Sequence, residues 1–209
     1  MLIGVVPHRD LADFEERARR YDDGWRGGLH HEISRRVCGF ALKASPEPRW
    51  ILDVGCGTGH LLGLLAEACP GAVELVGVDP APSMVEVARS RARDPRIVFS
   101  AGAAEQLPLP DARFDLVVST TSFDHWADQA RGLGECRRVL RPGGCLTLAD
   151  QFSNWLLPTV LLGRRGKART VRRASRLVAA AGFTSLEWHD VYASFIRAVT
   201  ATRWALEIP

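Results

Sequence analysis

Short apolar runs rich in β-branched residues alternate with helical stretches through the middle of the sequence, and this alternation constrains the fold more than any other feature. Each run is followed by a turn of glycine, aspartate or proline and then by a helical stretch. Such alternation is typical of a parallel sheet with helices on both faces. The expected strands are Trp50–Val54, Leu75–Val78, Ile97–Ser100, Leu116–Ser119 and Cys145–Ala149. The expected helices between them are His60–Ala68, Ser83–Arg93 and Asp128–Leu140.

The two ends of the sequence follow a different pattern. Phe183–His189 and Ala193–Ala201 are strand-like and are separated only by Asp190–Tyr192, which is too short for a crossover helix. Two strands joined so closely are predicted to form an antiparallel hairpin. Before the first strand, Leu11–Tyr21 and His30–Leu42 are predicted to be helices that cover the open end of the sheet. The prediction is an α/β, doubly wound, seven-stranded sheet that is mostly parallel, with a C-terminal antiparallel hairpin.

Length and composition exclude several classes of protein. A chain of 209 residues with 46% hydrophobic and 24% charged residues suits one globular domain, not a fibre or a disordered protein. The first residues lack the apolar core of a secretory signal, and no apolar run approaches the ~20 residues that span a bilayer. The five cysteines are scattered without a CxxC pair. This predicts reduced thiols, no metal site and a cytoplasmic location.

The net charge of +3 is divided unevenly along the chain. Residues 1–150 carry 18 Lys/Arg against 21 Asp/Glu, whereas residues 151–209 carry 9 against 3. Seven cations lie within residues 164–176, with no acid among them. Three are expected on the solvated face of a helix that stops at Gly182, namely Arg172, Arg173 and Arg176. The four that precede this helix indicate an acceptor with negative charge; they are Arg164, Arg165, Lys167 and Arg169.

The most informative segment is a glycine-rich turn between a strand and a helix. The sequence Ile51–His60 reads ILDVGCGTGH, with glycines at 55, 57 and 59 and Asp53 ahead of them. Glycines without a Cβ let a ligand approach the backbone closely at a helix N-terminus, which is typical of a cofactor turn. The dinucleotide pattern GxGxxG would need a third glycine where this chain has His60. A nicotinamide dinucleotide is therefore the poorest fit.

This segment resembles the first motif of the class I S-adenosylmethionine-dependent methyltransferases. Further motifs follow in order: VGVDPAPSM with Asp79 at the end of the second strand, GAAEQLPLPDARFDLVVST at 102–120, and RRVLRPGG at 137–144. The resemblance covers about residues 50–150 and is closest to small methyltransferases of the quinone-biosynthesis type. It implies a Rossmann-like fold and S-adenosylmethionine as cofactor. The implied cofactor-binding residues are Tyr21, Asp53, Gly55, Cys56, Gly57, Gly59, Asp79, Pro80, Met84, Ala104, Glu105, Ser119 and Thr120.

Physical roles follow for some of these residues. A carboxylate at Asp79 can accept two hydrogen bonds from a ribose diol, and Met84 is a polarizable side chain near the expected adenine. The third motif departs from the family, which usually has GDAE where this chain has Gly102–Glu105. Either Glu105 replaces the adenine-binding aspartate, or the backbone of Ala104 and apolar packing take over. Losing one such hydrogen bond costs about 1 kcal/mol, which weakens cofactor binding without abolishing it.

The methyl acceptor is expected at the carboxyl ends of the strands, where open parallel sheets bind their ligands. The segments predicted to reach this edge are 119–126, 150–151 and 21–25. His125 is the candidate general base, because its ordinary pKa lies near neutrality; the alternative is that it only lines the pocket. His30, His31 and His60 have no metal-like spacing and are interpreted as pocket-rim or surface residues.

The chain is thus predicted to be one methyltransferase domain over residues 1–209. Its parts are a helical cap at 1–45, a cofactor-binding core at 50–150, a substrate-covering segment at 151–170, and a final helix and hairpin at 171–209. The predicted reaction is in-line transfer of a methyl group to an O, N or C centre of a small, anionic or apolar acceptor. The alternatives are a non-catalytic cofactor-binding protein and, as a poorer fit, an RNA methyltransferase. The oligomeric state is predicted to be monomer or homodimer, without a nucleic-acid partner.

Overall fold

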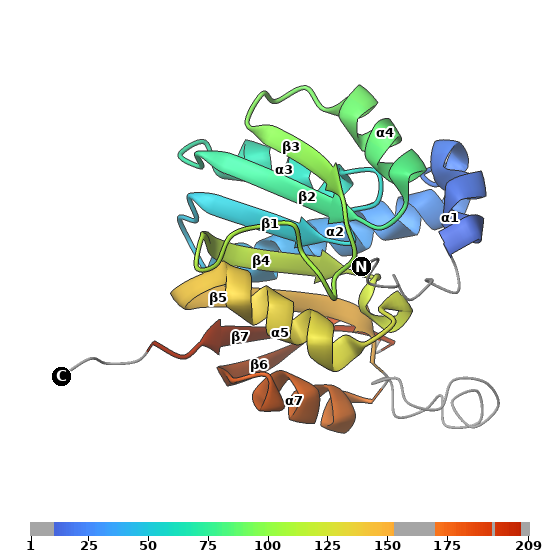
Figure 1. The fold of residues 1–209 in the computed structure, drawn as a ribbon. Helices are drawn as coiled ribbons and strands as arrows, with labels where there is room; N and C mark the ends of the chain where they lie inside the picture. Colours follow the sequence, from blue (N-terminus) through green and yellow to red (C-terminus); the bar gives the residue numbers. More distant parts are fainter. Residues whose placement is uncertain (1–10, 153–169, 194, 206–209) are drawn as a thin grey trace, which may run out of the picture.

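A computed structural model of the chain describes residues 11–152, 170–193 and 195–205 (Figure 1). Its helices are α1 (Leu11–Arg17), the 3-10 helix η1 (Ala18–Arg20), α2 (Gly24–Ala44), α3 (His60–Ala68), α4 (Pro82–Arg91), the 3-10 helix η2 (Phe123–His125), α5 (Gln129–Val139) and α7 (Val171–Ala180). Its strands are β1 (Trp50–Val54), β2 (Glu74–Asp79), β3 (Ile97–Ala101), β4 (Phe114–Thr120), β5 (Leu140–Gln151), β6 (Phe183–Tyr192) and β7 (Ile196–Arg203).

The strands form one seven-stranded sheet in the order β3-β2-β1-β4-β5-β7-β6. The first five strands pair in parallel, and β7 pairs antiparallel with both β5 and β6. The predicted fold, a mostly parallel sheet with a C-terminal antiparallel hairpin, is confirmed. Because the chain reverses direction in the sheet order next to β1, the carboxyl ends of β1 and β4 flank the crevice where ligands bind in such folds.

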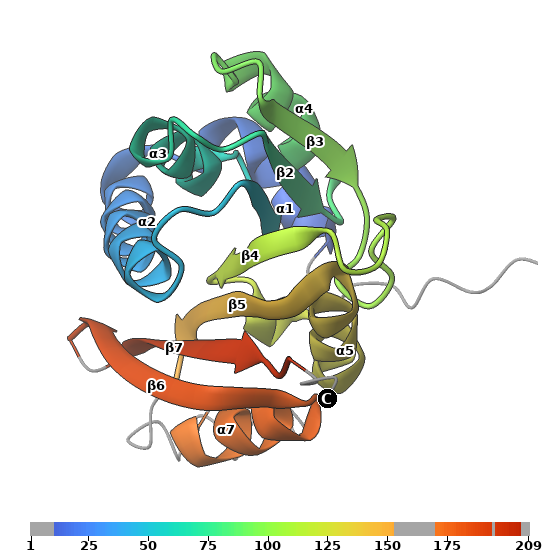
Figure 2. The ribbon, with the colours of Figure 1, turned by 90° about the vertical axis from the view of Figure 1, so that its left-hand side faces the viewer.

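Helices cover both faces of the sheet (Figure 2). On one face, α2, α3 and α4 pack on the sheet through a core that includes Leu62, Leu65 and Val85. On the other, α5 and α7 pack through a core that includes Leu133, Val139 and Val178. The central strands are buried on both sides, which explains why they appear in the sequence as continuous apolar runs.

Local signals fix several helix starts. The Asp128 carboxylate accepts a hydrogen bond from the Arg131 N–H at 3.0 Å and caps α5. The Thr170 hydroxyl accepts from the Arg173 N–H and caps α7. The arginines of α7 are exposed while Ala174 and Val178 are buried, which confirms the predicted solvated face of this helix.

Several predicted boundaries were wrong. The hairpin does not turn at Asp190–Tyr192: these residues belong to β6, because Asp190 pairs with Arg197 across the hairpin and Val191 is buried against α2. The second strand therefore begins at Ile196, not at Ala193. The helix predicted from His30 begins at Gly24, and β5 extends from Leu140 to Gln151 around a bulge at 141–144.

Two expectations, on membrane-spanning segments and on the segment at 151–170, concern parts of the chain that the structure does not fully describe. Within the part of the chain that the structure describes, no helix is long and apolar enough to cross a membrane. Most of the segment at 151–170 and all four cations that precede α7 lie outside the described residues.

Candidate functional site

The glycine turn connects the end of β1 to α3 and is held against β2. Both Gly55 and Cys56 donate their backbone N–H groups to the Val78 carbonyl, at 2.7 and 3.2 Å. Gly55, Gly57 and Gly59 have positive φ values of 75°, 51° and 83°, a conformation that other residues rarely adopt. A Cβ on Gly57 would meet no protein atom within 4 Å, so this glycine faces open space.

Asp79 joins the glycine turn to the start of α4. One carboxylate oxygen accepts the Gly57 N–H at 2.9 Å, and the other accepts the Ala81 N–H at 2.9 Å. Burial raises the pKa of Asp79, and these two hydrogen bonds oppose that rise. Each oxygen keeps a lone pair for a further donor, so the carboxylate can still bind a diol.

Asp53 is a buried acid beneath the turn. Its side chain is 2% exposed, and its Oδ1 has no hydrogen-bond partner within the described residues. Burial, with a smaller contribution from the charge of Asp79, raises the pKa of Asp53 to about 8. The neighbouring Cys56 thiol also has a raised pKa, chiefly through burial, and stays protonated rather than serving as a nucleophile.

This raised pKa predicts a pH dependence of stability. Folded Asp53 holds its proton up to about pH 8, whereas the unfolded chain releases it near pH 4. The contribution of this group to the free energy of unfolding therefore falls as pH rises from 4 to 8. We expect Asp53→Asn, which mimics the neutral acid, to gain at least about 1 kcal/mol relative to wild type between pH 5.5 and pH 8.

Thermal unfolding at the two pH values measures this gain, as a shift of roughly 2–4 °C in Tm. The matched control is Asp13→Asn, an exposed aspartate on α1, which should show no such pH-dependent gain. The same Tm difference between Asp53→Asn and wild type at both pH values would contradict the assignment.

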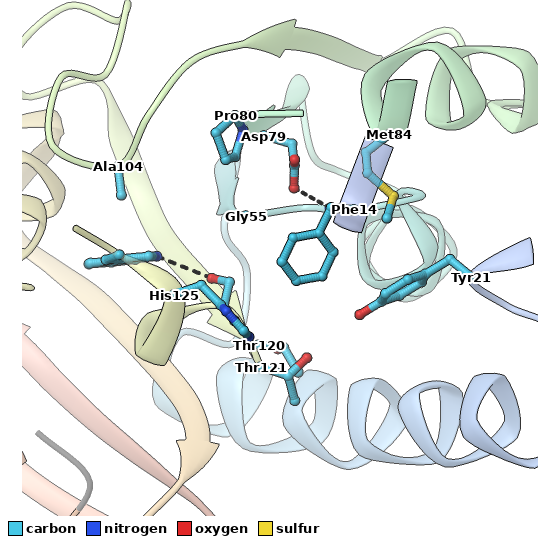
Figure 3. Close-up of a pocket in the computed structure, with 13 residues that line it drawn as sticks. Phe14, Tyr21, Gly55, Asp79, Pro80, Met84, Ala104, Thr120, Thr121 and His125 are labelled. Atoms are coloured by element: carbon cyan, nitrogen blue, oxygen red, sulfur yellow. Dashed lines mark hydrogen bonds between the residues drawn. The ribbon is translucent and has the colours of Figure 1, made fainter. Parts of the chain in front are cut away.

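Residues from five segments meet in one pocket at the carboxyl edge of the sheet (Figure 3). Among the predicted residues, those lining it are Tyr21, Gly55, Gly57, Asp79, Pro80, Met84, Ala104, Thr120 and His125. Phe14, Thr121, Ser122 and Trp126 complete the lining. A second, adjoining cavity on the α2 side shares Tyr21 and Gly57 and adds Asp53, Cys56 and His30. The two cavities together extend from Asp53 to Ala104, across the glycine turn.

Two aromatic residues of the N-terminal region cover the pocket. The Phe14 side chain of α1 enters it between Asp79 and Tyr21 (Figure 3). The Tyr21 ring stacks on His30 at a centroid distance of 5.2 Å, and its hydroxyl bonds to Thr121. Burial, then the charges of Asp79 and Asp22, raise the pKa of Tyr21 to about 12. The phenol therefore stays protonated at neutral pH.

His125 lies on the opposite wall, in η2. Its ring meets Phe14 edge-on at 5.1 Å between centroids. The turn that carries it is fixed by Asp150, whose carboxylate accepts the Asp124 N–H at 2.9 Å. Burial raises the pKa of Asp150, while its backbone hydrogen bonds and the nearby His125 lower it. A buried acid thus anchors the turn that brings an imidazole to the pocket.

Three predicted cofactor residues do not line either cavity. Gly59 packs against the Phe99 ring, where an added Cβ would lie 2.6 Å from the ring carbon Cζ. Ser119 is fully buried, with its hydroxyl 2.7 Å from that of Ser122. The Glu105 carboxylate accepts the Asp128 N–H at 3.0 Å at the start of α5. Of the two alternatives for adenine, the structure places Ala104 at the pocket and directs Glu105 toward α5.

Sequence reasoning missed some lining residues. Thr121, Ser122 and Trp126 fall within the segment predicted to reach the crevice, but their individual contacts were not anticipated. The Trp126 indole donates to the Ser122 hydroxyl at 3.3 Å, which in turn donates to the Val54 carbonyl at 3.0 Å. No sequence motif predicts that Phe14 lines the pocket, because it lies on α1, a helix of seven residues outside the motifs that follow the glycine turn. His30, interpreted as a rim residue, lines the second cavity.

Comparison with known proteins finds a methyltransferase domain in this chain. A family model described as a methyltransferase domain matches residues 52–148. A demethylmenaquinone methyltransferase of Deinococcus radiodurans is 39% identical over 152 residues, which are 72% of this chain and 58% of that protein. The chain therefore matches less than two thirds of that relative's length.

Solved structures share the fold. A Haloferax volcanii methyltransferase, solved in complex with a methyltransferase activator, has a TM-score of 0.78 at 20% identity and covers 96% of this chain and 100% of its own. Human N-acetylserotonin methyltransferase in complex with S-adenosylmethionine has a TM-score of 0.72 at 21% identity and covers 96% of this chain and 61% of its own. The matching domain over residues 52–148 and the shared sheet show a Rossmann-like methyltransferase fold, and they make this chain similar to the class I S-adenosylmethionine-dependent methyltransferases.

Proposed function

We propose that this protein uses S-adenosylmethionine to methylate a small molecule at an O, N or C centre. The observation that carries the proposal is the Asp79 carboxylate, which is bonded to the Gly57 and Ala81 N–H groups and still faces the pocket. A carboxylate in this position suits a ribose diol. Pro80, Met84 and Ala104 supply apolar surface for an adenine ring beside it.

The residues around the glycine turn fit the rest of this cofactor. The unpartnered Asp53 oxygen offers an acceptor near a methionyl ammonium group. The open space in front of Gly57 leaves room for the cofactor to lie against the turn. When bound, S-adenosylmethionine supplies an activated methyl group on a sulfonium. The protein then has to align the acceptor, exclude water and, for some acceptors, remove a proton.

Calorimetric titration with S-adenosylmethionine and S-adenosylhomocysteine tests the proposal. We expect both to bind to the wild-type protein, and we expect methyl transfer from labelled cofactor to an acceptor. The first acceptors to try are phenols and quinols, because the Deinococcus relative is named for a quinone-type substrate. No binding of either ligand would refute the proposal. Binding with no transfer to any acceptor would favour the non-catalytic alternative.

His125 is proposed as the general base for a phenol or enol acceptor. It lies across the pocket from Tyr21, on a turn anchored by a buried acid. We expect His125→Ala to lower kcat by roughly 10²-fold or more while the Kd of S-adenosylmethionine changes less than about twofold. His125→Gln controls for the lost contact with Phe14, because it retains side-chain bulk without a base. Full activity in either variant would leave His125 as a lining residue.

A further inference from the structure

Asp22 directly follows the Tyr21 cover and is held by three other segments. Its Oδ1 accepts a hydrogen bond from His31 Nε2 of α2 at 3.1 Å, and its Oδ2 is paired with the Arg91 guanidinium of α4. The Thr58 side chain of the glycine turn also bonds to this carboxylate. We call these four residues the Asp22 cluster. Its members come from α2, α4, the glycine turn and the cover itself.

The environment of Asp22 favours a fixed, ionised carboxylate. Its side chain is only 12% exposed. Burial raises the pKa of this carboxyl, but the hydrogen bonds from Thr58, Arg91 and His31 outweigh burial and bring it below the ordinary value. The carboxylate is therefore charged at neutral pH, when its bonds to the cluster are strongest.

The backbone at Asp22 is fixed as well. A Cβ on Gly27 of α2 would lie 2.0 Å from the Asp22 carbonyl oxygen, so the first turn of α2 packs directly on this residue. Asp23 donates its N–H to the Arg20 carbonyl at 3.0 Å, which closes the turn on the other side. The position of Tyr21 thus depends on how firmly Asp22 is held.

Tyr21 bridges the two cavities. It lines both of them, and its ring lies beside Phe14 and Met84 (Figure 3). A shift of the Asp22 turn would move this ring away from the glycine turn and open both cavities to water.

We propose that Asp22 is a positioning residue that holds Tyr21 closed over the cofactor site, through its bonds to His31, Thr58 and Arg91. This inference rests on the proposed use of S-adenosylmethionine. The apparent Kd of a ligand rises in proportion as the binding-competent fraction falls. At saturation the ligand itself restores the closed state, so kcat is preserved.

Asp22→Ala tests the inference. We expect it to raise the Kd and KM for S-adenosylmethionine by about tenfold while kcat stays within about twofold of wild type. Glu32→Ala is the matched control, because Glu32 is also paired with arginines, and those that the described part of the chain supplies are Arg35 and Arg36 of its own helix, α2. This control should leave KM unchanged. A lower Tm with an unchanged KM would show a merely structural role and overturn the inference.

A double-mutant cycle adds a second readout. We expect Arg91→Ala to raise KM in the same way, and the double variant to lose less than the two single effects multiplied together. Fully multiplicative effects would show that the two side chains act separately, against the inference. If Asp22→Ala does not fold, Asp22→Asn and Arg91→Ala carry the same comparison, since both retain most of the cluster.

Trypsin cleavage reports on the cover without any cofactor. Arg17, Arg19 and Arg20 precede the cover, and opening should expose the bonds that follow them. We expect Asp22→Ala to be cut there about tenfold faster than wild type and Glu32→Ala at the wild-type rate, with fragments identified by mass spectrometry. Equal rates in Asp22→Ala and wild type would overturn the inference. A wild-type protein that binds no S-adenosylmethionine would instead refute the proposed function.

Discussion

Asp79→Asn should raise the Kd of S-adenosylmethionine by at least about 100-fold, although the two side chains have the same shape. Both carboxylate oxygens accept backbone N–H groups, from Gly57 and from Ala81. The asparagine side chain must turn its NH₂ group toward either the Gly57 N–H or the Ala81 N–H, so that two hydrogen-bond donors face each other. The substitution therefore loses an acceptor for the ribose and also disturbs the glycine turn.

The measurement for Asp79→Asn is calorimetry, with unfolding followed in parallel. Glu74→Gln is the matched control, because Glu74 lies at the other end of β2 and pairs with Arg113. It should bind the cofactor as wild type does. Wild-type affinity in a folded Asp79→Asn variant would show that the diol is bound elsewhere, and it would remove the main support for the proposed function.

Gly57→Ala should weaken binding of S-adenosylmethionine by roughly 30-fold or more while the protein stays folded. The new methyl group would meet no protein atom, so it would project into the space in front of the turn. The free energy of unfolding should fall by only about 1–2 kcal/mol, the cost of a side chain at positive φ.

Alanine substitutions at two other glycines serve as comparison variants for Gly57→Ala. Gly59→Ala should destabilise more, by about 1–3 kcal/mol beyond the cost of its positive φ, because its Cβ would collide with Phe99 behind the turn. Gly63→Ala in α3, where a Cβ meets nothing, should bind normally and gain about 0.5–1 kcal/mol of stability. Unchanged affinity in Gly57→Ala would contradict the placement of the cofactor in front of this turn.

The central sheet could be predicted from the sequence because each strand carries its own signal. The strands at β1, β2 and β4 are buried on both faces, and the turns after them concentrate glycine and aspartate. Asp79, Gly55 and Gly57 could be placed at one edge for the same reason, since parallel strands end together.

Other features depend on contacts between distant segments and leave no local pattern. Phe14 reaches the pocket because α1 packs on α4, a contact that no spacing in the sequence encodes. Strand β6 runs on through Tyr192 because Val191 is buried against α2. The cap residues Asp22 and His31 become neighbours of Thr58 and Arg91 only when the helices assemble.

The sheet order has a consequence for how the molecule is assembled during synthesis. Strand β7 follows β6 in the chain but lies between β5 and β6 in the sheet, so β6 is an edge strand that pairs, among the described strands, with β7 alone. The first five strands, with the glycine turn and Asp79, leave the ribosome well before β7 and can pair without it. The edge of β5 that pairs with β7 then remains without a partner strand until β7 is synthesised. A nascent chain paused before residue 196 would therefore present an unpaired, aggregation-prone strand edge to other chains.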